Sequence, residues 1–223
     1  MALKKLRSTL KFRRSIGIEE IITAFDNGVD GDGDCSDMAD KLEKGLSSKK
    51  FYVQGYDKEG RSTLYFIPRN VHGHDAEMTL KDAIYSIERA VACSKANDGT
   101  INAIVDFSKF SILRHSPPFD IGKKFMTSLR NHYAGQIHRI YIVNAPTTFS
   151  ILWRMFQPFI GTTTREKIYM LSGNKVIKEM TMNDMYNVSQ LPNWIISNGK
   201  KNRSLDINEY LYNTKFDQSF DDE

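Results

Sequence analysis

The stretch RIYIVNAPTTFSILWRMFQPFIG, from Arg139 to Gly161, changes its character within a few residues. Its first part is apolar and rich in isoleucine and valine, which is typical of a buried strand in a parallel sheet. The turn residues at 144–146 (Asn-Ala-Pro) end that strand, and residues 148–157 follow as a predicted helix. Because Pro158 lacks a backbone donor, we expect the helix to end or bend there.

This predicted helix has almost no polar side. Its polar residues are Ser150, Arg154 and Gln157, whose spacing aligns them as one narrow stripe that we expect to stay in contact with water. A helix that is apolar on its other sides must be buried or must face something apolar. Two interpretations follow: a core helix between the sheet and outer helices, or a helix that lines a cavity for an apolar ligand. Periodicity does not separate them.

The segments around this stretch alternate between strand and helix. Apolar runs predict strands at about 62–67, 100–107 and 167–171, and an amphipathic pattern predicts a helix over 77–96. The motif SPPFD, at residues 116–120, opens a further helix. Right-handed crossovers between such strands give a largely parallel sheet flanked by helices, so we predict an α/β fold.

The two ends of the chain differ from this alternating part. Amphipathic patterns over 3–14, 18–25 and 37–46 predict a small helical appendage before the sheet. The last residues, from Tyr212 on, are acidic, and we expect them to be frayed. We divide the chain into an N-terminal helical segment, an α/β domain and a C-terminal tail, at residues 1–48, 49–200 and 201–223.

The bulk composition suits one packed domain. The chain has 223 residues, of which 40% are hydrophobic. Its net charge of +4 and pI of about 8.9 suit weak attraction to an anionic membrane, but they are too small to predict a nucleic-acid partner. Two cysteines and no apolar export signal predict a reducing, cytoplasmic location. With no stretch of about 18 apolar residues, we expect any membrane contact to be peripheral and transient. We also expect a monomer.

No stretch predicts catalysis, a metal site or a cofactor. The acidic loop over residues 26–37 has Gly28 where a calcium loop needs a ligand, and it lacks the final glutamate. His72 and His74 lack further ligands at metal-binding spacing. Residues 161–167 lack the second glycine and the Lys-Ser/Thr pair of a phosphate loop, and no Gly-x-Ser-x-Gly turn occurs. We therefore predict a protein that is not an enzyme.

Four further motifs occur in order around the opening stretch: TLKFRRSIGIEEI, YDKEGRSTLYF, IVDFSKFSI and LPNWIISNG. Together with the opening stretch, extended to Leu171, they resemble the CRAL-TRIO lipid-binding domain family, of the yeast phosphatidylinositol/phosphatidylcholine transfer protein type. The resemblance covers about residues 2–200, and the opening stretch is its most specific part. It implies a short, mostly parallel sheet that forms the floor of an apolar lipid pocket covered by helices.

The resemblance also implies a ligand and a site. The ligand is a phospholipid, with phosphatidylinositol or phosphatidylcholine favoured, which the protein transfers or presents between membranes. The aromatic helix and residues 156–168 correspond to a movable gate, and Thr164 and Lys167 match the residues that serve the headgroup phosphate. The resemblance assigns pocket and gate positions to Ile142, Asn144, Phe149, Trp153, Phe156 and Phe159.

The sequence departs from the family pattern in two places. Gly135 stands where the family has a glutamate that supports the headgroup site, and the family's upstream Arg-Ala-Arg-Lys-Phe motif has no counterpart in this sequence. Two alternatives therefore stay open. The ligand could be a sterol or an isoprenoid, or the domain could be a non-catalytic scaffold or adaptor that has lost headgroup recognition.

Overall fold

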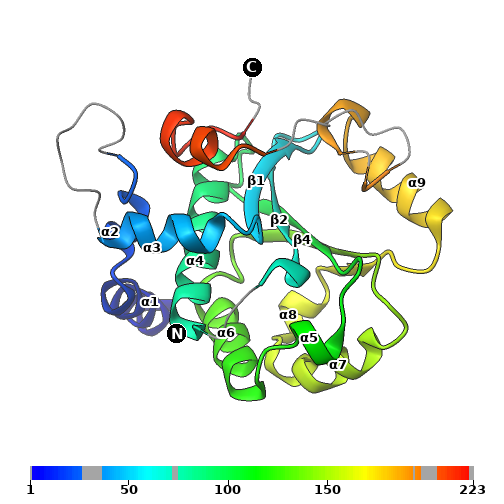
Figure 1. Ribbon diagram of the computed structural model, residues 1–223, viewed down its shortest axis with the longest axis horizontal. Coiled ribbons are helices and arrows are strands. Elements are labelled where there is room, and N and C mark those ends of the chain that lie inside the picture. The colour runs from blue at the N-terminus through cyan, green and yellow to red at the C-terminus, as the bar shows by residue number, and fades with distance from the viewer. Residues whose placement is uncertain (1, 27–36, 72–74, 193, 197–204, 221–223) are drawn as a thin grey trace.

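The computed structural model describes residues 2–26, 37–71, 75–192, 194–196 and 205–220. Within them the chain forms a five-stranded sheet whose spatial order follows the chain order (Figure 1). The first two strands are antiparallel, and all other neighbours are parallel. The strands are β1 (Phe51–Tyr56), β2 (Ser62–Phe66), β3 (Ile101–Asp106), β4 (Ile137–Val143) and β5 (Ile168–Met170).

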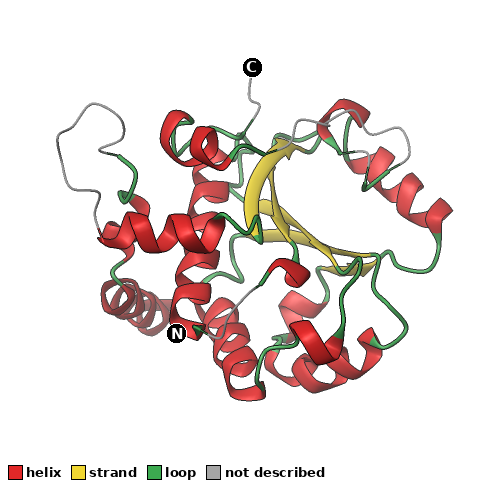
Figure 2. Cartoon of the chain, viewed as in Figure 1, coloured by secondary structure: helices red, strands yellow, loops and turns green. Residues whose placement is uncertain are grey.

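Helices lie on both faces of this sheet (Figure 2). In Figure 1, α4, α6 and α7 lie on one side of the sheet and α9 lies on the other. The predicted N-terminal appendage is present: α2 and α3 pack against α4, and α1 packs against α2 and α6. The helices are α1 (Ala2–Ile16), α2 (Ile18–Ile22), α3 (Asp37–Leu46), α4 (Ala76–Cys93), α5 (Ile112–His115), α6 (Phe119–His132), α7 (Phe149–Phe156), α8 (Thr162–Arg165) and α9 (Lys175–Met185).

Short turns of other helix types join these elements. The 3-10 turn η2 is the one that bears on the site, because it continues α7 through Pro158 and so bends the chain where the sequence predicted a bend. The turns are η1 (Pro68–Asn70), η2 (Gln157–Phe159) and η3 (Val188–Gln190), and a π-helical turn, η4, covers Glu209–Asn213.

The register of the sheet sorts side chains onto two faces of different chemistry. Successive residues of a strand point to opposite faces, so cross-strand partners share a face. One row of partners is apolar: Leu64, Ala103, Ile140 and Ile168. The adjoining row is polar: Thr63, Asn102 and Arg139. The apolar face turns toward α4, α6 and α7, and the polar face turns toward α9.

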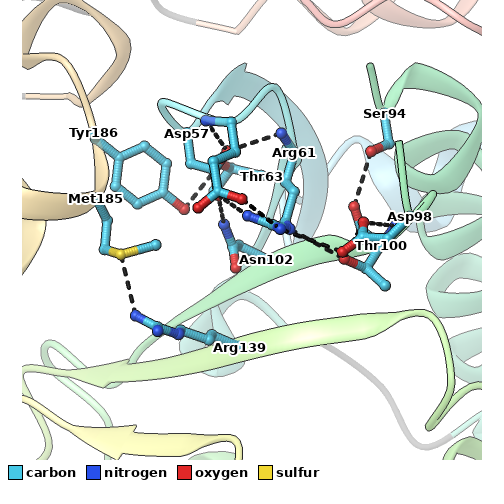
Figure 3. A network of polar contacts seen from close by, with 11 residues as sticks. Asp57, Arg61, Thr63, Ser94, Asp98, Thr100, Asn102, Arg139, Met185 and Tyr186 are labelled. Atoms are coloured by element: carbon cyan, nitrogen blue, oxygen red, sulfur yellow. Dashed lines mark hydrogen bonds and ion pairs between the residues drawn. The ribbon is translucent and has the colours of Figure 1, made fainter. Parts of the chain in front are cut away.

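Hydrogen bonds connect the side chains on the polar face of the sheet (Figure 3). The buried Asp57 carboxylate accepts from the side-chain amide of Asn102 at 2.8 Å and from the backbone N–H of Arg61 at 2.8 Å. Thr63 donates to the hydroxyl of Tyr186, just beyond α9, at 3.1 Å. This network ties the β1–β2 turn, the sheet and the α9 region together, so the polar face is a structural face.

The predicted order of strands and helices from residue 62 to 171 is confirmed, with ends that differ by a few residues. The strand β1 and the helices α5, α8 and α9 were not predicted. β1 is buried along nearly its whole length, so its sequence lacks the polar alternation that marks a strand with one wet face. Gly55, at φ 73°, also interrupts its register with β2. A buried run that contains a glycine gives a weak strand signal.

The prediction of a frayed C-terminal segment is wrong for the part up to Phe220. The Phe220 side chain is only 1% exposed, and its neighbour Ser219 accepts a hydrogen bond from the backbone N–H of Gly55 at 2.8 Å. The fully buried Arg89 of α4 donates to the backbone carbonyl of Thr214 at 3.0 Å. The prediction was based on the acidic residues of the segment, whereas its buried aromatic residues determine where it packs.

Several features of the sequence lie outside the described residues. They are residues 27–36 of the acidic loop with Cys35, His72 and His74, and residues 193 and 197–199 of the motif that ends at Gly199. Among the residues that are described, no group of three or more His, Cys, Asp or Glu side chains could hold a metal ion. Nor does any helix in that part of the chain have the length and apolar character needed to cross a bilayer.

Candidate functional site

An apolar cavity of about 210 Å³ lies between the apolar face of the sheet and the helices α4, α6 and α7. Its walls are almost entirely apolar. The sheet supplies the floor, and every strand contributes at least one side chain; examples from β1 to β5 are Phe51, Leu64, Val105, Ile142 and Ile168. The predicted sheet floor is therefore present, because the apolar row of each strand points to this side.

Two helices form the side walls of the cavity. Ile87 of α4 and Phe125, Leu129 and Tyr133 of α6 line it, and the spacing of four between the α6 residues places them on one helix face. Tyr133 donates its hydroxyl hydrogen to Glu88 at 3.0 Å, so its ring lines the cavity while its polar atom is bonded outside the lining. Burial and the nearby Glu88 raise the pKa of Tyr133, which keeps it neutral.

Helix α7, at the centre of the opening stretch, covers the cavity. Four of its residues line the cavity: Phe149, Leu152, Trp153 and Phe156. Phe156 is 6% exposed and lies against Gly122 of α6, where an added Cβ would come within 2.4 Å of the ring. The helix therefore faces a cavity, and the absence of a side chain at Gly122 permits its close approach to α6.

The opposite side of α7 faces solvent. Ser150 and Arg154 are exposed as predicted, and Gln157 is half-buried. Ile151 lies between them and is 60% exposed. The expectation that both apolar faces of this helix are covered is therefore wrong for Ile151. Single exposed apolar residues are common on protein surfaces, so Ile151 bears on function only together with exposed apolar residues of neighbouring helices.

Asn144 lies in the turn between β4 and α7 and does not line the cavity. Its φ of 55° is left-handed, a conformation that asparagine tolerates better than most residues. Its side-chain amide donates to Asp106 at the end of β3, at 2.8 Å. Burial alone would raise the pKa of Asp106, but hydrogen bonds from Ser108, Arg69 and Asn144 outweigh it, and the net pKa is lowered. An ionised Asp106 thus holds the turn between β4 and α7 in place.

Phe159 lies beyond α7 and also stays outside the cavity lining. Its ring packs edge-on against Phe119 at 5.7 Å, and the Lys123 ammonium lies 5.3 Å from the ring centre. The next residue, Ile160, does line the cavity. The segment after α7 is therefore held against the start of α6 by aromatic and cation–π contacts.

The two residues predicted for the headgroup occupy different environments. Thr164 lines the cavity. Lys167 does not, and its ammonium donates to the backbone carbonyls of Ala134 and Ile137. Gly135, which stands in place of the family's glutamate, has no atom within 4 Å of the position that a Cβ would take. The space at Gly135 is therefore open.

Sequence reasoning missed one charged residue at the cavity. Arg130, in the last turn of α6, is exposed and yet contributes to the cavity lining. Its position one residue after the lining Leu129 gave no sign that it would reach the same cavity. The only available signal was its place between Phe125 and Tyr133 on a helix predicted to be amphipathic.

The fold and the cavity define a class of protein: a mostly parallel sheet whose apolar face, together with the covering helices, encloses a pocket for an apolar ligand. The chain belongs to the CRAL/TRIO domain family, because the pattern of that family matches residues 46–194. Family membership supports lipid binding and transfer as the general function of the chain.

Individual relatives are similar at modest identity. A CRAL-TRIO domain-containing protein of Schizosaccharomyces pombe is 26% identical over 75% of this chain and 15% of its own length. The phosphatidylinositol/phosphatidylcholine transfer protein SFH13 of Arabidopsis thaliana is 29% identical over 83% of this chain and 30% of its own. The SEC14 cytosolic factor of Candida glabrata is 26% identical over 56% of this chain and 47% of its own. The chain thus spans less than half of the length of each.

A solved structure has the same fold. The crystal structure of Sfh5 matches with a TM-score of 0.64, covering 94% of this chain and 71% of that protein, at 12% identity. At this identity the match concerns the fold alone, and it agrees with the α/β class predicted from the alternation of strands and helices.

Proposed function

We propose that this protein binds the acyl chains of a phospholipid in the apolar cavity and transfers or presents the lipid between membranes, without catalysis. The observation that carries the proposal is a cavity floored by the sheet and walled almost entirely by apolar side chains. The names of two Arabidopsis thaliana relatives, the phosphatidylinositol/phosphatidylcholine transfer proteins SFH13 and SFH11, favour phosphatidylinositol or phosphatidylcholine as the ligand. A cytoplasmic protein that touches membranes transiently fits this role.

The energetics of such an exchange are close to balance. A buried methylene gains about 0.8 kcal/mol relative to water. The lipid leaves a bilayer that is already apolar, so little of this gain appears in the net transfer. The protein's task is then kinetic: to shield the acyl chains from water during the crossing and to open at the membrane.

We propose that α7 with the following residues to 168 is the gate. The cavity of about 210 Å³ is smaller than the roughly 300–1,000 Å³ of ordinary ligand pockets, so a two-chain lipid requires the cover to move outward. The contacts that helix α7 makes with α6 are apolar, such as Phe156 against Gly122. Apolar contacts can be exchanged for contacts with acyl chains at little cost, which suits opening against a bilayer.

The outer surface of the gate region suits contact with an anionic membrane. Ile151 on α7 is 60% exposed, Leu113 on α5 is 98% exposed and Phe119 at the start of α6 is 44% exposed. Lys123 of α6 and Arg154 of α7 are exposed in the same elements. Apolar side chains that enter the headgroup layer, with basic residues around them, are the usual means of peripheral attachment.

The headgroup end of the site is proposed to involve Thr164 and Lys167. Thr164 contributes to the lining, and Lys167 is tied to the loop beside it. Without a carboxylate at position 135, recognition of an inositol ring has less support than recognition of a phosphate. A sterol, an isoprenoid or a scaffold without ligand are the competing outcomes.

A fluorescence experiment tests whether acyl chains enter this cavity. Trp153 lines the cavity, whereas Trp194 lies beyond α9, beside Tyr65 of β2. Lipids brominated on their acyl chains should quench the fluorescence of the Trp194→Phe variant, which retains Trp153. They should quench the Trp153→Phe variant much less. Equal quenching of both variants, together with no lipid detected by native mass spectrometry after incubation with vesicles, would show that the protein does not bind lipid in this cavity.

A further inference from the structure

The end of α6 meets α8 at one end of the cavity. Arg130, Ala134 and Thr164 all contribute to the lining there. Gly161, just before α8, lies so close to Arg130 that an added Cβ would sit 3.3 Å from its Cγ and Cδ atoms. The stem of Arg130 is thus packed, while the residue as a whole is exposed. A lining residue that is also exposed lies at the mouth of a cavity, with its charged head toward water.

The Arg130 guanidinium is largely uncommitted. Within the part of the chain that the structure describes, its one hydrogen bond is a long contact of 3.4 Å from Nε to the side chain of the adjacent Asn131. No carboxylate among the described residues lies within ion-pair distance of it. A guanidinium carries five N–H donors in a planar fork, so most of its donors are available to a ligand.

Lys167 has fewer N–H donors available to a ligand than Arg130. An ammonium has three N–H donors, of which one makes a short bond to the carbonyl of Ile137 and a second makes a long contact of 3.4 Å to the carbonyl of Ala134. These bonds join the start of β5 to the loop between α6 and β4. Lys167 therefore holds the loop that follows Arg130, and one donor is left for a ligand.

We infer that Arg130 binds the phosphate of the lipid headgroup at the mouth of the cavity, and that Lys167 acts mainly by positioning the loop beside it. This inference rests on the proposed function. A phosphate cannot enter walls that are almost entirely apolar without a large desolvation cost, so it must stay at the mouth. A planar guanidinium binds phosphate oxygens in a bidentate manner, which an ammonium cannot do.

The test uses two labelled lipids that share the same fluorescent acyl chain, phosphatidylinositol and diacylglycerol, presented in phosphatidylcholine vesicles. The wild type is compared with Arg130→Ala, Arg130→Lys and the control Lys124→Ala. Lys124 is exposed on the same helix and does not line the cavity, so its replacement removes an equal charge. Thermal melting checks that each variant is folded, and glycerophosphoinositol serves as a soluble competitor without acyl chains.

We expect Arg130→Ala to bind phosphatidylinositol about 10- to 100-fold more weakly, since hydrogen bonds to a charged group contribute about 1.5–3 kcal/mol. Its uptake of diacylglycerol should not change. The affinity of Arg130→Lys for phosphatidylinositol should lie between those of the wild type and Arg130→Ala, and Lys124→Ala should match the wild type.

If Arg130→Ala binds phosphatidylinositol as the wild type does, or loses both lipids equally, the inference is wrong while the proposed function stands. If the wild type takes up neither labelled lipid, and native mass spectrometry finds no phosphatidylcholine extracted from the vesicles, the proposed function fails and the inference with it. Tight, Arg130-dependent binding of glycerophosphoinositol without lipid uptake would assign the residue to a free phosphate ester and overturn its role in lipid recognition.

Discussion

The two faces of the sheet differ in what their side chains do. In β3, Asn102 points to the polar face and hydrogen-bonds to Asp57, whereas the next residue, Ala103, points to the other face and lines the cavity. On the polar face, the buried side chains of Asp57, Asn102 and Thr63 form hydrogen bonds with neighbouring groups. On the apolar face, small and large side chains leave about 210 Å³ unfilled.

This difference indicates how a fold can carry a cavity. Side chains that line empty space lose dispersion contacts, so a cavity lowers stability relative to a filled core. The network around Asp57 lies on the other face and does not depend on whether the cavity is filled. Stability and ligand binding therefore depend on alternate residues of the same strands. Substitutions on the polar face should mainly affect stability, and substitutions on the apolar face should mainly affect ligand binding.

The largest effect is expected from Asp57→Ala on the polar face. Asp57 is fully buried in its side chain, and removing it leaves the nearly buried Arg61 without its inner carboxylate and Asn102 without its acceptor. Breaking a buried pair of this kind costs about 3–5 kcal/mol of unfolding free energy, which urea denaturation measures. Glu59→Ala removes an exposed carboxylate from the same arginine and should cost less than about 1 kcal/mol. Equal losses for the two variants would contradict the division between the faces.

The next effect concerns the cover of the cavity. A Cβ on Gly122 would meet the Phe156 ring at 2.4 Å, so Gly122→Ala must displace that ring and should cost about 1–3 kcal/mol. The displaced ring weakens the closed position of α7, so lipid exchange should become faster. Gly135→Ala is the control, because no atom lies within 4 Å of its Cβ position, and we expect it to be neutral or slightly stabilising. Thermal melting and vesicle exchange rates measure both; a stable Gly122→Ala protein would show that the ring moves freely.

The fold was largely predictable from the sequence, because its signals are local. The strand at Ile137–Val143, the turn and the helix at Phe149–Phe156 each follow from composition and proline position within a few residues. Periodicity did not decide whether the helix faced core or cavity, since both require the same apolar residues. That decision depends on the empty volume, which is set by how α6 and α7 meet at Gly122.

The charged residues of the site were less predictable than the apolar ones. Phe149, Trp153 and Phe156 line the cavity, because apolar residues on one face of a helix share one environment. The position of a long charged side chain depends on contacts made by other segments. Lys167 is bonded to two carbonyls, and Arg130 lies at the cavity mouth because Gly161 makes room for its stem. Neither arrangement leaves a pattern in the local sequence.

A smaller change in stability is expected when the cavity is filled. Ala103→Leu places a larger apolar side chain into empty space, so unfolding free energy should change by less than about 1.5 kcal/mol while lipid uptake falls. Thr63→Val, on the other face, loses the hydrogen bond to Tyr186 and about 1 kcal/mol, and its lipid uptake should be unchanged. Urea denaturation and vesicle extraction distinguish the two. An Ala103→Leu protein that extracts lipid as well as the wild type would place the acyl chains elsewhere.

The smallest effect is a pH dependence at the edge of the polar face. Hydrogen bonds from the backbone and side chain of Thr100, assisted by Arg61, lower the pKa of Asp98 from 3.8 to about 2. Because the pKa is lower in the folded protein than in the unfolded chain, the ionised carboxylate contributes stability above pH 3.8, and that contribution is lost as the pH falls through about 2. Asp98 is 47% exposed, so solvent screens the effect and its size should be small. Carboxyl chemical shifts followed by NMR should place its midpoint near pH 2 in the wild type and nearer to its ordinary value in Thr100→Val, which removes the side-chain donor and keeps the backbone one. A midpoint at 3.8 in the wild type would mean that the network of Figure 3 does not extend to Asp98 in solution.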